Sequence, residues 1–93
     1  MGKAVRERPA RLAEKLLQVR QALGLSQSEM LRQLGFEDIL DYKRISEYEL
    51  GKNEPPLSVL LQYARVVGVC LERLVDDELN LPEMLPVKSR HRP

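Results

Sequence analysis

Apolar residues recur along this chain at helical spacing, in short segments that end at glycine or proline. The first apolar stripe has the i, i+4, i+7, i+11 spacing of one helix face and comprises Leu12, Leu16, Val19 and Leu23. Pro9 suits a first helical turn, where its missing N–H group would be unpaired anyway. Gly24 suits the left-handed residue that ends a helix. The pattern predicts a first helix from about Pro9 to Leu23.

A capping box marks the start of a second helix. Ser26 is followed three residues later by Glu29, so each can satisfy a backbone N–H group at the helix start. The apolar side of this segment comprises Met30, Leu31 and Leu34. Since Gly35 follows, the second helix is predicted to end there.

The start of a third helix is less sharply defined, because either Asp38 or Asp41 can act as its N-cap. We favour Asp41. This choice predicts a helix over residues 42–50, with Ile45 and Tyr48 facing inward and a glycine directly after it.

Proline and glycine delimit two further helices. Pro55 excludes a helix interior and restrains the residue before it to extended geometry. A fourth helix is predicted from about Leu57 to Val67 and a fifth from about Leu71 to Val75. Their expected inward residues are Leu60, Leu61, Ala64, Val67, Leu71, Leu74 and Val75. Because the alternation typical of strands never persists, the sequence predicts an all-α protein of five short helices.

Composition excludes several classes of protein. The chain has 93 residues, 43% hydrophobic and 31% charged, which fits one small domain with a modest core. Cys70 is the only cysteine, so an internal disulfide and a thiolate zinc cluster are excluded. No nucleophile–base pair, metal-ligand cluster or phosphate-binding glycine loop is evident, so we expect neither catalysis nor a cofactor. With no membrane-spanning run and no secretory h-region, a cytoplasmic protein is expected.

Charge is distributed unevenly along the chain. We divide the sequence into a basic N-terminal arm over residues 1–8, a helical domain over residues 9–76 and a tail over residues 77–93. The net charge is only +1. Residues 1–20 nevertheless hold six bases against two acids, and residues 87–93 add three bases. Such asymmetry allows a local basic surface on a nearly neutral protein.

Three motifs stand in a fixed order across residues 10–76. They are Gly24, Leu25, Ser26 and Gln27; then Ile45, Ser46, Glu49, Gly51 and Pro55; then Val67, Gly68 and Val69. Their order and spacing resemble the phage-repressor-type (Cro/C1, XRE) helix-turn-helix family. The resemblance implies a five-helix lambda-repressor-like domain, with the helix-turn-helix at helices two and three. It also implies a bacterial or phage transcriptional regulator, such as a repressor, with double-stranded DNA as its partner.

The same resemblance implies roles for individual residues, with the third helix in the major groove. The implied base contacts are Tyr42, Lys43, Arg44 and Glu47. The implied phosphate contacts are Gln27, Arg20, Lys52 and Asn53. Arg20 and Glu49 also correspond to a pair that in the family often forms a partly buried salt bridge, which directs the arginine towards phosphate.

Two features depart from the family pattern. The connection between the second and third helices is longer than usual, with residues 36–40 extra, and this can rotate the outer face of the third helix. Residues 41–53 also carry three bases and three acids, a net charge of zero.

Two functions therefore stay open. One copy would contact only a few base pairs, so we expect a homodimer that reads two half-sites. The alternative is an antitoxin or another protein-interaction module of the same fold. In that case the apolar tail segment LNLPEMLP would bind a partner such as a toxin.

Overall fold

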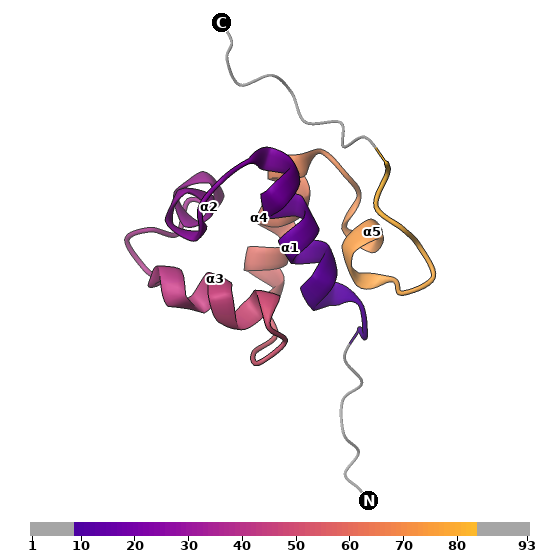
Figure 1. Ribbon diagram of the computed structural model, residues 1–93, viewed down its shortest axis with the longest axis horizontal. Coiled ribbons are helices and arrows are strands. Elements are labelled where there is room, and N and C mark those ends of the chain that lie inside the picture. Colours follow the sequence, from indigo (N-terminus) through magenta and orange to yellow (C-terminus); the bar gives the residue numbers. More distant parts are fainter. Residues whose placement is uncertain (1–8, 84–93) are drawn as a thin grey trace, which may run out of the picture.

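The computed structural model describes residues 9–83, and within them the chain forms five helices and no strand. The helices are α1 (Leu12–Leu23), α2 (Gln27–Leu34), α3 (Tyr42–Glu49), α4 (Leu57–Val67) and α5 (Leu71–Val75). In Figure 1, α2 and α3 lie to the left of α1 and α5 lies to its right. The predicted all-α, five-helix architecture is confirmed. The predicted arm over residues 1–8 and residues 84–93 of the predicted tail lie outside the described part.

Side-chain caps mark the starts of α2 and α3. The predicted capping box is present, since the Ser26 hydroxyl accepts from the Glu29 N–H at 3.1 Å and the Glu29 carboxylate accepts from the Ser26 N–H at 2.8 Å. Asp41 is the N-cap of α3, as favoured, because its carboxylate accepts from the Lys43 N–H at 2.8 Å. The first helix begins at Leu12, later than the predicted Pro9.

The core is a single cluster drawn from all five helices, and α2 packs against both α3 and α4. One inward prediction is wrong: Leu61 is 37% exposed, whereas Val59 and Tyr63 are buried. Apolar residues occupy positions all around α4, so periodicity alone could not decide which side of this helix faces the core.

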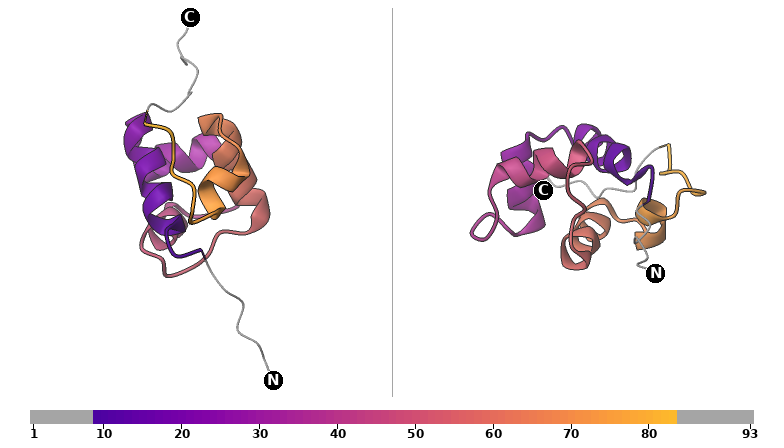
Figure 2. Two further views of the ribbon diagram at one scale, coloured as in Figure 1. Left: turned by 90° about the vertical axis from the view of Figure 1, so that its right-hand side faces the viewer. Right: turned by 90° about the horizontal axis from the view of Figure 1, so that it is seen from below.

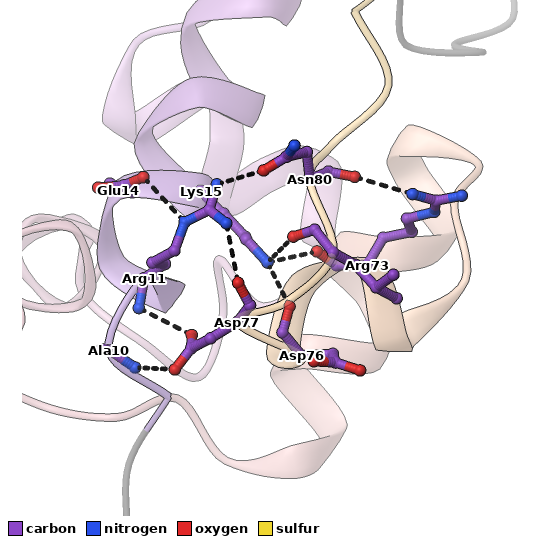
Figure 3. Close-up of polar contacts among 9 residues, drawn as sticks. Ala10, Arg11, Glu14, Lys15, Arg73, Asp76, Asp77 and Asn80 are labelled. Carbon is purple, nitrogen blue, oxygen red and sulfur yellow. Dashed lines mark hydrogen bonds and ion pairs between the residues drawn. The ribbon is translucent and has the colours of Figure 1, made fainter.

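A buried lysine joins α1 to the end of the described chain. Lys15 is fully buried, and its ammonium donates to three backbone carbonyls. The acceptors are the oxygens of Arg73 at 2.9 Å, Asp76 at 2.8 Å and Leu79 at 2.8 Å (Figure 3). Burial lowers the pKa of Lys15. Because all three ammonium protons find acceptors, a charge in this position is tolerated.

Arg11 and Asp77 extend this junction towards solvent. The Asp77 carboxylate accepts from the backbone N–H groups of Ala10 and Arg11 at 2.8 and 3.0 Å. Arg11 in turn donates to the Asp77 carbonyl at 2.9 Å and to the Asn80 side chain at 2.8 Å. Residues 77–83 therefore lie along α1, where the left view of Figure 2 shows the yellow segment passing between α1 and α5.

This packing leaves less of the apolar tail exposed than its composition suggests. Leu79 and Leu81 are both half-buried, and Leu81 packs against the core. No helix in the described residues is long and apolar enough to span a membrane.

Candidate nucleic-acid interface

The two sides of α3 differ sharply in exposure. Ile45 and Tyr48 are buried in the core and fix the orientation of the helix. On its outer side Tyr42 is 48% exposed, and Lys43 and Arg44 are exposed as well. Three of the four residues predicted to contact bases are therefore accessible at the N-terminal end of α3.

Glu47, the fourth predicted base contact, makes contacts within the protein. Its Oε1 atom accepts from Asn53 Nδ2 at 2.8 Å and from Arg44 Nη1 at 3.3 Å. Its backbone carbonyl accepts from the Lys52 N–H at 2.9 Å. Gly51, with φ +76°, supplies the left-handed residue that lets the chain turn back onto α3. The structure thus brings together two predicted base contacts and the predicted phosphate contact Asn53.

A second cluster joins the three helices around the turn. Arg20, from α1, donates through Nε and Nη2 to the two carboxylate oxygens of Glu49, at 2.6 and 3.0 Å. Gln27, the first residue of α2, donates to the same carboxylate at 3.3 Å. The Glu49 side chain is only 4% exposed and that of Arg20 19%. The ion pair with Glu49 raises the pKa of Arg20, so this arginine stays charged.

This cluster limits what Arg20 can offer to a phosphate. Its Nη1 donates to the Leu25 carbonyl at 2.9 Å, in addition to the two bonds to Glu49. A guanidinium carries five N–H groups, so two stay available. Gln27 is half-buried and held at the start of α2, where backbone N–H groups also favour an anion. Both phosphate roles stay predictions.

Lys43 and Lys52 differ from the other basic residues of this face. Arg44 is paired with Glu47 and Arg20 with Glu49, whereas Lys43 and Lys52 are exposed and make no ion pair within residues 9–83. Asp41 places its carboxylate at the N-terminus of α3, where it caps a backbone N–H and offsets the positive end of the helix dipole. The two lysines are therefore the cations on this face whose charge is not offset by a bound carboxylate.

One residue of this face was not singled out from the sequence. Ile39, in the connection between α2 and α3, is 74% exposed. It borders a shallow hollow at the start of α3, which is lined by Ile39, Leu40, Asp41, Lys43, Arg44 and Glu47. The available signal was an isoleucine between acidic residues in the segment that exceeds the family's usual length.

No group of three or more metal-ligating side chains lies together in the part of the chain that the structure describes. The exposed face instead carries hydrogen-bond donors, the carboxylates of Asp41 and Glu47, and apolar side chains. These groups match the phosphates and base edges of a nucleic acid better than they match a small-molecule substrate.

Comparison with known proteins agrees with this geometry. A model of the helix-turn-helix family HTH_3 matches residues 16–74, well over half of the chain. Neither a search of curated proteins nor a search of solved structures found a match. The matched residues run from within α1 to within α5 and include both clusters around α3. The family binds DNA and is not enzymatic. The chain therefore belongs to the HTH_3 (XRE/Cro/C1-type) helix-turn-helix family of DNA-binding proteins.

Proposed function

We propose that this protein is a sequence-specific transcriptional regulator that binds double-stranded DNA as a homodimer, with α3 in the major groove. One observation carries the proposal. The core holds one side of α3 through Ile45 and Tyr48, while Tyr42, Lys43 and Arg44 stand exposed on the other. Such a helix can enter a groove without refolding, because its orientation is fixed before it binds.

The exposed groups match the hydrogen-bonding edges of bases. Lys43 and Arg44 can donate to O6 and N7 of guanine, and Arg44 can do so through two parallel bonds. The second carboxylate oxygen of Glu47 takes no part in its contacts with Arg44 and Asn53, so it can accept from N4 of cytosine. Each well-formed contact of this kind contributes about 1–3 kcal/mol of discrimination between bases.

Phosphate contacts would flank the groove on both sides of α3. Gln27 stands at the N-terminus of α2, and Lys52 and Asn53 stand in the turn after α3. Because phosphate contacts are the same for every sequence, these residues would set position and affinity, not base preference.

Dimerisation follows from the amount of sequence that one copy can recognise. A single α3 of eight residues spans only a few base pairs. Two copies on half-sites about one helical turn apart, roughly 34 Å, would recognise a palindrome.

Salt dependence gives this proposal a quantitative form. Lys43 and Lys52 are the two exposed cations per copy on this face that make no ion pair within residues 9–83. Neutralising two phosphate charges per copy corresponds to a slope of about −4 in log K against log salt concentration for a dimer. Affinity would then fall about 150-fold between 50 and 200 mM salt.

The experiment begins with selection of bound duplexes from a random pool, followed by anisotropy titrations of the selected DNA at several salt concentrations. A recovered palindrome supports the dimer. Lys52→Ala should weaken binding to all sequences and make the dimer's slope shallower by about 2. Lys43→Ala should also change the selected sequence.

Arg65→Ala is the matched control, since it removes an exposed cation from the last turn of α4. Equal affinity of the Lys43 and Lys52 variants and the wild type would refute the assignment of roles on α3. Failure of the wild-type protein to bind duplex DNA would refute the proposed function itself.

A further inference from the structure

Ile39 has the highest exposure among the large hydrophobic side chains of residues 9–83, at 74%. A single exposed isoleucine needs no explanation by itself. The position of Ile39 does call for an explanation, because this residue shares a hollow with Lys43, Arg44 and Glu47 at the start of α3. These three residues are among the four predicted above to contact bases. The connection is the loop at the left edge of the molecule in Figure 1, between α2 and α3.

The connection holds Ile39 outward by ordered contacts on both sides. Phe36 and Leu40 pack against the core and act as anchors. The N–H groups of Ile39 and Leu40 both donate to the Phe36 carbonyl, at 2.9 and 2.8 Å. Asp41 then caps α3 directly afterwards. Since Leu40 turns inward and the backbone is fixed, Ile39 is presented to solvent with little further loss of conformational entropy on binding.

The charges around Ile39 distinguish between the two parts of a duplex that it could contact. Asp38 and Asp41 stand on either side of it and are both exposed. Carboxylates so placed are repelled by a sugar–phosphate backbone, and an aliphatic side chain gains nothing from a phosphate. Base edges in the major groove offer one apolar feature, the C5-methyl group of thymine.

We infer that Ile39 is a further specificity-determining residue, which packs against a thymine methyl group next to the bases read by Lys43 and Arg44. This inference rests on the proposed function, because it needs α3 in the major groove. The occupant of the hollow is thus a duplex with thymine at a defined position. The longer connection between α2 and α3 would extend the recognised sequence by about one base pair.

The test removes the methyl group and the side chain separately. In the duplex selected by the wild-type protein, each thymine is replaced in turn by deoxyuridine, which lacks only the methyl group. We expect one thymine position in each half-site to be sensitive to this replacement. Replacing that thymine in a single half-site should weaken wild-type binding about fourfold, the effect of exposing one buried methyl group. Ile39→Ala should weaken binding to the original duplex by a similar or larger factor and should bind thymine and deoxyuridine equally at that position.

Leu57→Ala is the control, since Leu57 is a comparably exposed aliphatic residue, at 68%, on α4. It should keep the wild-type preference for thymine. Thermal melting by circular dichroism should show that both variants fold like the wild type, because both side chains are exposed.

The outcomes separate this inference from the proposed function. If Lys43→Ala weakens binding but Ile39→Ala keeps the wild-type ratio of thymine to deoxyuridine affinity, the role of Ile39 is overturned and the proposed function stands. If Ile39→Ala instead changes the sedimentation behaviour of the protein without DNA, Ile39 contacts a second copy and the inference is equally overturned. If the wild-type protein binds no duplex, both proposals fall together.

Discussion

The ion pair between Arg20 and Glu49 should control the stability of the helix-turn-helix. Arg20→Met removes the guanidinium and leaves the Glu49 carboxylate, only 4% exposed, with the Gln27 amide as its one remaining side-chain partner within residues 9–83. Breaking a buried pair in this way typically costs about 3–5 kcal/mol, because one charge stays buried without its partner. The Arg20 side chain keeps 19% exposure, so we place the expected loss somewhat below that range, at about 2–4 kcal/mol.

Removing the other partner of the ion pair should cost less stability. Glu49→Leu leaves the Arg20 guanidinium with its bond to the Leu25 carbonyl and with some access to water. We expect a loss of about 1–3 kcal/mol. The double variant removes both charges and fills the space with apolar groups, which is often close to neutral. It should therefore lie within about 1 kcal/mol of the wild type, so the two substitutions should be strongly non-additive, with a coupling energy of about 4 kcal/mol.

Urea denaturation of all four proteins, followed by far-ultraviolet circular dichroism, measures these free energies of unfolding. Equal slopes with urea concentration are required, since a changed slope would indicate a changed denatured state. In thermal melts, a loss of 3 kcal/mol corresponds to roughly 12–24 °C for a domain of this size. If both single variants lose less than about 1 kcal/mol, or if the losses add, the pair is screened by solvent and the reasoning from its burial is wrong.

Three further predictions concern the rest of the core and the junction of Figure 3. Lys15→Met should lower the free energy of unfolding by about 1–3 kcal/mol, because three carbonyls lose a charged donor while the desolvation cost of the ammonium also disappears; a variant as stable as the wild type in urea would contradict this. Tyr63→Phe should leave stability unchanged or raise it by about 1 kcal/mol, since the buried Tyr63 hydroxyl has no hydrogen-bond partner in the described residues; a clear loss in urea would contradict it. Backbone N–H groups of Ala10 and Arg11 hold the pKa of Asp77 below its ordinary 3.8, so its contribution to stability is complete above that pH and lost as the pH falls through the lowered pKa. Asp77→Asn should therefore weaken the acid dependence of stability, measured as midpoints in urea between pH 2 and 7, and an unchanged acid dependence would count against this role.

The helices could be predicted from the sequence because their ends are set by neighbouring residues. Ser26 with Glu29, and Asp41 before α3, form their caps within a single turn, so no distant contact is needed to recognise them. The bounds of α4 follow equally from the prolines before it and Gly68 after it. The start of α1 was harder, because Asp77 holds the N–H groups before Leu12 from across the molecule.

The burial of Lys15 required the tertiary structure. The apolar stripe of α1 contains Leu12, Leu16 and Val19, and Lys15 falls on the same face. That placement was a signal, but a lysine there can also extend its charged end to the surface. What fixes it inside is the turn of residues 76–79, whose carbonyls face α1 only in the folded chain.

In the candidate site, too, some contacts could be predicted from the sequence and others could not. The contact between Arg20 and Glu49 was expected from the resemblance, and the structure forms it. The contacts of Glu47 with Arg44 and Asn53 could not be expected, because they depend on how residues 51–53 turn back onto α3. The exposure of Ile39 likewise depends on the inward packing of Phe36 and Leu40 on either side of it.

The internal pairs also bear on how this nearly neutral protein would distinguish its own site from other DNA. Cations held by carboxylates contribute little to the general attraction of phosphates, and here Glu47 holds Arg44 and Glu49 holds Arg20. A duplex of the wrong sequence would then meet mainly Lys43 and Lys52. A duplex of the right sequence can give Arg44 a guanine edge and offer the other oxygen of Glu47 a cytosine amino group, so the acids are used in recognition instead of opposing it. On the proposed function, the balance of charge around α3 therefore lowers affinity for arbitrary DNA more than affinity for the cognate site, and specificity rises because of it.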